Sequence, residues 1–188
     1  MRGVLAEKFS ELTPTDNGNS YYTFRLGNIW GMVLDCAEDK PDSHEEYGYT
    51  VCCHAFRKRQ TAFRKRIIAS GEHLAEGIRH RVVIAHNPFT HQLKPPFDIE
   101  KETYTEWARL LEDEIKPHAM ICGHLHKLII SKKGSEYDTL GQPCTVVVGA
   151  DINHKTGFWA GCGFDFEEDG IYATFTDSNG EKTNREKL

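Results

Sequence analysis

Two histidines separated by one residue follow directly on a short apolar run. They stand in the tetrapeptide Gly123-His124-Leu125-His126, after Ala119–Cys122. Side chains alternate between the two faces of a strand, so histidines two positions apart at a strand end are expected to point the same way. Neutral imidazole is a common metal ligand, and Gly123, which has no Cβ, lets the backbone come close to a bound group. The tetrapeptide therefore predicts a pair of metal ligands.

A third candidate ligand, His86, follows the apolar run Arg81–Ala85. Between the two apolar runs, residues Lys101–Lys116 place apolar side chains at helical spacing, and Pro117 ends the pattern. A right-handed strand–helix–strand unit of this kind has parallel strands, so both carboxyl ends lie at one edge of the sheet. We therefore expect His86 to meet His124 and His126 at that edge, where open α/β sheets bind their ligands.

These residues resemble the C-terminal half of a calcineurin-like metallophosphoesterase, a superfamily that includes the purple acid phosphatases. The resemblance rests on His86 in the segment VVIAHNPF and on His124 and His126 in ICGHLH. Looser support comes from YYTFRLGNIWGMVLDC, which is similar to the family's aromatic strand pair ending in an aspartate. Gln60 at the start of a helix and the closing FTDSNGE are also similar. Of these elements, only the G-H-x-H pattern is specific.

The resemblance implies an α/β fold over residues 1–188, namely the C-terminal part of a layered calcineurin-like β-sandwich flanked by helices. It implies two divalent or trivalent metal ions, with His86 and His124 on one and His126 on the other. The ions are Mn, Fe or Zn, because mixed imidazole and carboxylate ligands suit all three. The implied activity is two-metal hydrolysis of a phosphomonoester or phosphodiester, with in-line attack of hydroxide on phosphorus.

The family's N-terminal half supplies three further motifs, and we assign none of them here. G-D-x-x-D and G-N-H do not occur, and Asp42-Ser43-His44 is interpreted as part of an irregular acidic loop rather than as the family's D-x-H. The family's general-acid histidine thus has no counterpart, and the catalytic and substrate-binding residues stay unassigned. His91 and His154 are interpreted as loop residues, and Asn87 either as a turn residue or as part of the site entrance.

The isolated chain is therefore expected to be inactive, whether it is a fragment or has lost half of its site. Its expected partners are a phosphoester substrate and either the missing N-terminal half or a second copy of the chain. Two other interpretations stay open. One is a non-catalytic remnant that serves as a binding or dimerisation module. The other is a structural zinc domain, for which a closed site needs a fourth ligand that the sequence does not obviously offer.

Composition excludes several classes of protein. With 39% hydrophobic and 27% charged residues, the chain of 188 residues is typical of one soluble domain. Its net charge of -5 gives no general attraction to nucleic acids, and no run approaches the roughly 20 apolar residues of a membrane span. The six cysteines form no C-x-x-C pair, which favours a reducing cytoplasm. Nucleophile-elbow and glycine-rich nucleotide motifs are absent from the sequence.

The remaining patterns predict the elements around the site. A hairpin joins Tyr21–Leu26 to Ile29–Leu34, and residues 35–50 form a long excursion typical of a binding loop. A helix over Phe56–Ala69 carries basic residues interpreted as a solvated face. After the site, antiparallel strands and a frayed terminus over 180–188 are expected. These strands are Leu128–Ser131, Cys144–Val148, Phe158–Phe166 and Ile171–Thr176.

Overall fold

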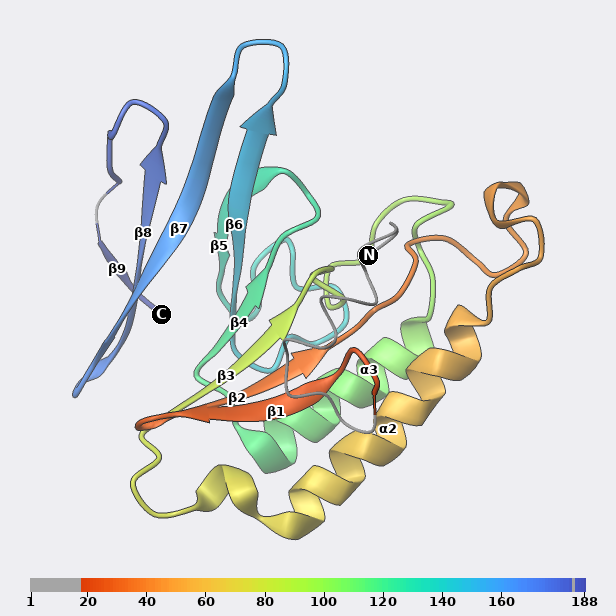
Figure 1. The fold of residues 1–188 in the computed structure, drawn as a ribbon, viewed down its shortest axis with the longest axis horizontal. Coiled ribbons are helices and arrows are strands. Elements are labelled where there is room, and N and C mark those ends of the chain that lie inside the picture. The colour runs from red at the N-terminus through yellow and green to blue at the C-terminus, as the bar shows by residue number, and fades with distance from the viewer. Residues whose placement is uncertain (1–17, 184) are drawn as a thin grey trace.

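The computed structural model describes residues 18–183 and 185–188. Within these residues, nine strands form one sheet in the order β1-β2-β3-β4-β6-β7-β8-β9, with β5 paired to β6 (Figure 1). Most neighbouring strands are antiparallel, so the fold is mixed α/β with a large sheet and few helices. The strands are β1 (Tyr22–Leu26), β2 (Ile29–Leu34), β3 (His80–Ala85), β4 (Ala119–Cys122), β5 (Lys127–Ser131), β6 (Thr145–Asn153), β7 (Phe158–Glu167), β8 (Gly170–Asp177) and β9 (Glu186–Lys187).

Two long helices accompany the sheet, α2 (Cys53–Ser70) and α3 (Lys101–Leu110). A π-helical turn over Leu111–Ile115 continues α3, and short 3-10 turns cover Glu45–Tyr47 and Glu72–Leu74. In the described part of the chain, none of the helices combines the length and apolar character that crossing a membrane requires.

The centre of the sheet is parallel. Strand β3 lies between β2 and β4 and runs parallel to both, with Val83 beside Met32 and Met120. Strand β4 also runs parallel to β6. The carboxyl ends of these strands therefore share one edge, and the strand–helix–strand prediction for residues 81–122 is confirmed.

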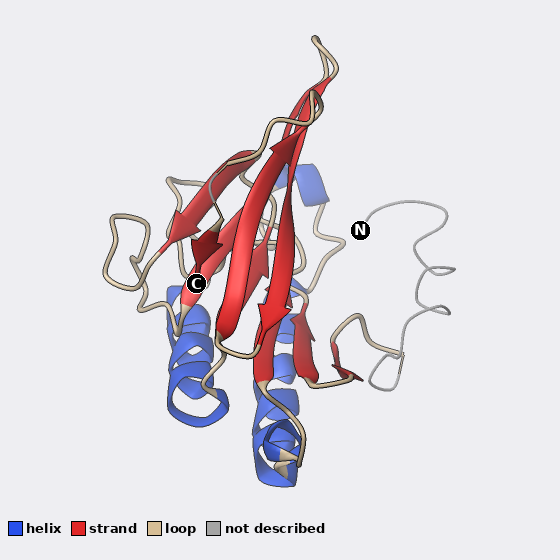
Figure 2. Cartoon of the chain, turned by 90° about the vertical axis from the view of Figure 1, so that its left-hand side faces the viewer, coloured by secondary structure: helices blue, strands red, loops and turns tan. Residues whose placement is uncertain are grey.

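The core lies between one face of this parallel centre and the two helices, which lie side by side against it (Figures 1 and 2). Trp107 and Leu111 are fully buried there beneath Met120. On the opposite face, Val82 and Ala119 pack with Ile171 and with phenylalanines of β7, at the amino ends of β3 and β4. The sheet thus curls over, so that β7 and β8 cover the end of the parallel centre that lies away from the histidines.

The basic helix differs from the sequence prediction in two ways. It begins at Cys53, so Gln60 lies in its interior rather than at its start. Its basic residues are not all solvated: Arg57 and Arg64 are 1% and 0% exposed. Arg57 donates to the backbone carbonyls of Cys36 and Glu38, and the guanidinium of Arg64 lies 3.9 Å from the ring centroid of Trp107. The hydrogen bonds of Arg57 offset its burial, whereas Arg64 keeps Nε and Nη1 without hydrogen-bond partners. The sequence alone does not predict that either arginine is buried.

The C-terminal strands follow the prediction closely, with two differences. Strand β6 extends to Asn153, beyond the predicted end at Val148. The segment expected to fray contains β9, which pairs with β8 through Tyr172 and Lys187. The ammonium of Lys187 lies 3.0 Å from the Asp169 carboxylate, so the charged terminus gains ion pairs as well as backbone hydrogen bonds.

Candidate functional site

His86 and His124 meet at the carboxyl edge of the parallel strands. His86 directly follows β3, and His124 follows β4 by one glycine. The two rings are nearly perpendicular, with centroids 5.2 Å apart, and Nδ1 of His124 lies 3.4 Å from Nε2 of His86. The backbone N–H of Gly123 donates to the carbonyl of His86 at 2.9 Å, which ties the two strand ends together. The convergence expected from the topology is therefore present.

The separation of these two nitrogens suits a shared metal ion. Two nitrogens at about 2.0–2.1 Å from one tetrahedral metal lie about 3.3–3.4 Å apart. The observed 3.4 Å matches this spacing, and it is also within the range of a hydrogen bond between the two rings. The donor chemistry also fits, because neutral imidazole suits Zn and Fe.

His126 follows in the same turn as His124, but it does not line the cleft that His86 and His124 line. Strand β4 ends at Cys122 and β5 begins at Lys127, so both histidines of the tetrapeptide lie in the connecting turn. Their φ angles are positive, 67° for His124 and 50° for His126, and strand alternation does not set their directions. A left-handed backbone costs a residue with a Cβ about 1–2 kcal/mol, and such strain concentrates at functional sites. His126 is exposed, and it is close enough to His124 to affect its ionisation.

Gly123 is not required by close packing. Its φ is not positive, and a Cβ built there would lie 3.6 Å from Nδ1 of His86, an ordinary van der Waals contact. The expected role of this glycine, to let the backbone approach a bound group, therefore finds no steric support among the described residues.

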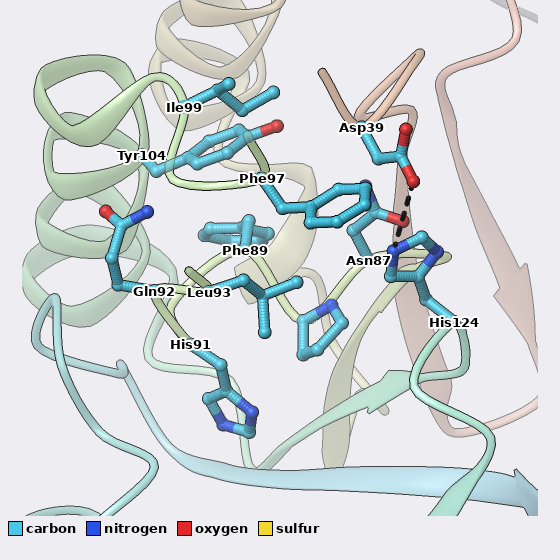
Figure 3. A pocket seen from close by; sticks show the side chains of 11 residues that line it. Asp39, Asn87, Phe89, His91, Gln92, Leu93, Phe97, Ile99, Tyr104 and His124 are labelled. Carbon is cyan, nitrogen blue, oxygen red and sulfur yellow. Dashed lines mark ion pairs between the residues drawn. The ribbon is translucent and has the colours of Figure 1, made fainter. Parts of the chain in front are cut away.

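An open cleft of about 310 Å³ lies over the histidine pair. Its lining residues come from the loop after β2 and from the ends of β3 and β4: Ala37, Glu38, Asp39, Lys40, Glu46, His86, Asn87 and His124. Oδ2 of Asp39 lies 3.7 Å from Nε2 of His124. The dashed line in Figure 3 marks this contact. The charged groups of the lining are three carboxylates and one ammonium, so the cleft favours cations over anions.

Of the two histidines that line this cleft, His124 is partly buried, whereas His86 is exposed. Burial lowers the pKa of His124, and the neighbouring His86 lowers it further, whereas Asp39 opposes the shift. The neutral form of the His124 imidazole, which is the form that binds metals, is thereby favoured near neutral pH.

A smaller cavity of about 30 Å³ adjoins the cleft behind Asp39 and His124. Figure 3 shows the side chains of Phe89, Phe97 and Tyr104 around it. An engineered cavity of about 150 Å³ binds benzene, whereas about 10–15 Å³ suffices for one water molecule. This hollow therefore admits water but not an aromatic group.

The tripeptide that the sequence left unassigned binds backbone groups through two of its side chains. Asp42-Ser43-His44 has the D-x-H spacing, but the Asp42 carboxylate accepts from the backbone N–H groups of Cys53 and His54 at the start of α2. Nδ1 of His44 accepts from the N–H of Glu46 and caps the short turn over Glu45–Tyr47. Neither residue lines the histidine cleft.

The other weighed residues divide between the site and the loops. Asn87 lines both the cleft and the small cavity, which fits its interpretation as part of the entrance. His91 lines the small cavity, where burial lowers its pKa. His154 is exposed in the segment between β6 and β7.

Sequence reasoning missed Asp39. A signal was present, because β2 is also followed by a helix and a parallel strand, so the residues after Leu34 must emerge at the histidine edge. Among the described residues, no group of three or more histidine, cysteine, aspartate or glutamate side chains is arranged to hold a metal ion. The convergent pair of His86 and His124 does not by itself make such a group.

Comparison of the sequence with known proteins found no matching family model and no matching curated protein. Function is accordingly inferred from the residues and their geometry.

Proposed function

We propose that this chain supplies histidine ligands to the binuclear metal site of a calcineurin-like phosphoester hydrolase. The observation that supports this proposal is the 3.4 Å approach of Nδ1 of His124 to Nε2 of His86, the spacing of two ligands on one ion. His126 follows in the same strained turn and is proposed as a ligand of the second ion. The proposed fold is the C-terminal part of the family's layered sandwich.

The charge of the cleft explains why such a site depends on cations. With three carboxylates and one lysine, the residues around the histidines repel a phosphate ester. Bound divalent ions supply the positive charge that attracts the ester and lower the pKa of water. Lys40 is the one ammonium in the lining, and its ion pair with Glu46 holds it at the rim. We assign to Lys40 a contact with the ester oxygens.

His86 and His124 alone do not complete a binuclear metal site, so hydrolysis is expected to need a partner. Two ions with balanced charge require carboxylate and further imidazole ligands beyond the pair that converges here. We propose that these ligands come from the family's N-terminal half or from a second copy of the chain. The substrate is a phosphomonoester or phosphodiester.

A second candidate function is a non-catalytic binding or dimerisation module. It is favoured by one observation, the lack of a metal-ready group of three side chains within residues 18–183 and 185–188. In such a module the histidine pair contributes to a contact surface rather than to hydrolysis.

Metal stoichiometry separates the two candidates. The 188-residue chain is loaded with Mn, Fe or Zn and analysed for bound metal, beside the double variant His86→Ala/His124→Ala and the control His154→Ala, which changes an exposed loop histidine. We expect about one ion per chain in the wild type and in the control, and none in the double variant. Equal metal content in all three proteins would contradict the proposed metal site. The non-catalytic binding or dimerisation module would then be the remaining candidate.

Complementation tests the hydrolase itself. This chain is mixed with an N-terminal half from the family, and the complex is analysed for metal and assayed. A complex that holds two ions and cleaves p-nitrophenyl phosphate or its diester supports the proposal. A complex that carries both ions but hydrolyses neither ester rejects it.

A further inference from the structure

The segment after β2 is held by buried side chains of α2. Oε1 of Gln60 accepts from the backbone N–H of Asp35 at 3.0 Å, and its Nε2 donates to the Asp35 carbonyl at 2.6 Å. One helical turn earlier, Arg57 donates through Nε to the carbonyl of Cys36 at 2.9 Å and through Nη2 to that of Glu38. These four hydrogen bonds fix the backbone up to the residue before Asp39.

The carboxylate of Asp39 is then oriented from one side. The buried Tyr47 hydroxyl donates to Oδ1 at 3.3 Å, and the ammonium of Lys40 lies 3.7 Å from the same oxygen. The Tyr47 hydroxyl is itself fixed, because it accepts from the backbone N–H of Lys40 at 3.2 Å. Oδ1 is thus engaged, and Oδ2 is the oxygen that faces His124.

His124 lies between this carboxylate and the other histidine. Its Nε2 is 3.7 Å from Oδ2 of Asp39, which is longer than a hydrogen bond but close enough for the negative charge to attract an N–H there, and its Nδ1 is 3.4 Å from Nε2 of His86. A carboxylate accepts and cannot donate, so the nitrogen that faces it is favoured as the protonated one. Histidines that bind metals commonly donate their other N–H to such a carboxylate, which fixes the tautomer and the ring orientation.

We infer that Asp39 is a positioning residue that keeps the proton of neutral His124 on Nε2 and leaves Nδ1 free to bind a metal ion beside His86. The inference about the tautomer stands on this geometry, and its consequence for metal binding rests on the proposed function. Asp39 itself does not enter the metal's coordination sphere, since it faces the opposite nitrogen of the ring.

The variant Asp39→Asn tests the tautomer. Tyr47 and Lys40 hold the acceptor oxygen of the asparagine where Oδ1 now lies, so its amide group points at Nε2 of His124. An amide donates there, and the proton of the imidazole moves to Nδ1. The ¹⁵N chemical shifts of the labelled, metal-free proteins report this directly. We expect unprotonated Nδ1 in the wild type and protonated Nδ1 in Asp39→Asn.

Glu46→Gln is the matched control, because it removes one negative charge from the same cleft without a contact to His124. Calorimetric titration with Zn²⁺ should show affinity reduced about 10–100-fold by Asp39→Asn, the usual effect of losing such a partner, and less by Glu46→Gln. The control should leave the His124 tautomer unchanged.

The outcomes separate the two claims. A tautomer that shifts in Asp39→Asn while no protein binds Zn²⁺ supports the role of Asp39 and rejects the proposed metal site. Zn²⁺ binding that is equal in the wild type and Asp39→Asn, with an unchanged tautomer, overturns the role of Asp39 and leaves the metal site. Equal losses of affinity in Asp39→Asn and Glu46→Gln, again with an unchanged tautomer, reduce Asp39 to a simple negative charge.

Discussion

Gln60 pairs with both backbone polar groups of Asp35, and it does so from a fully buried position in the middle of α2. The Gln60 amide thereby makes the two hydrogen bonds that a neighbouring strand would make to the backbone just after the last residue of β2, Leu34. Backbone groups that a side chain satisfies in this way are left unpaired when that side chain is removed.

Gln60→Leu should lower the free energy of unfolding by about 2 kcal/mol, because an apolar side chain of similar size leaves the N–H and C=O of Asp35 without partners. Chemical denaturation measures the change. Lys58→Ala, on the exposed face of the same helix, should stay within about 0.5 kcal/mol of the wild type. Equal stability of Gln60→Leu and Lys58→Ala would show that water replaces the two hydrogen bonds at no cost.

The two buried arginines of α2 should respond in opposite ways to the same substitution. Arg64 leaves Nε and Nη1 without hydrogen-bond partners, and burial lowers its pKa to about 9. Arg64→Met should therefore be neutral or raise the free energy of unfolding by about 1 kcal/mol. Arg57→Met removes the donor to two carbonyls and the arginine partner of the Glu100 carboxylate, which keeps only His54, and should cost about 3 kcal/mol or more. Thermal unfolding compares the stabilities of the two variants. An Arg57→Met variant more stable than Arg64→Met would contradict the prediction.

Acid should destabilise the fold through two histidines far from the cleft, the buried His73 and the more exposed His118. Burial lowers the pKa of His73 below the usual 6.5, partial desolvation lowers that of His118, and the charge of Arg81 lowers both further. Nδ1 of His118 also accepts from the backbone N–H of Arg81 at 3.0 Å, a bond that the protonated ring cannot make. The unfolded chain then binds more protons than the folded chain below about pH 6.5, so stability falls as pH drops from there.

Urea midpoints at pH 7.5, 6.0 and 5.0 measure this loss. His118→Asn is the informative variant, since its amide oxygen replaces Nδ1 as an acceptor but does not titrate. Its midpoint should fall less than that of the wild type over the same range. If the two proteins lose stability in parallel, His118 contributes nothing to the acid sensitivity.

The strained turn predicts that His126→Gly stabilises the chain while His126→Ala does not. Both variants remove the imidazole, but only glycine adopts a φ of 50° without a steric penalty. Relief of about 1–2 kcal/mol of strain, less the entropy that glycine adds to the unfolded chain, leaves a gain of about 0.5–1 kcal/mol. Thermal unfolding compares the two. An alanine variant as stable as the glycine variant would mean that the turn relaxes.

Much of the fold could be predicted because its patterns are local. The apolar runs that become β3 and β4, with a helix between them, are enough to place His86 beside His124. The direction of His126 could not be predicted in this way, because the alternation of side chains presumes an extended backbone and the chain turns at positive φ instead. Positions 124 and 126 are histidines rather than glycines, so the sequence does not indicate that the backbone has positive φ there.

The buried face of α2 is a second feature that could not be predicted from the sequence. Residues at spacings of four and three, from Cys53 through Arg57, Gln60 and Arg64 to Ile67, form one buried stripe. The helical period is thus regular, but three of these side chains are polar, and a search for apolar residues passes over them. Their partners are backbone carbonyls and an aromatic ring on distant segments, which only the folded chain brings near.

Because β3 lies between β2 and β4, the sheet holds the histidines of the cleft more firmly than it holds Asp39. Neighbouring strands lie about 4.8 Å apart, so the histidines after β3 and β4 meet across one spacing and are held by the sheet itself. Asp39 starts from β2, two spacings from β4, and its segment must cross over β3 to reach His124. In amide hydrogen exchange the residues 35–39 should therefore open with a lower free energy than the ends of β3 and β4. Brief release of this segment would leave the histidine pair assembled.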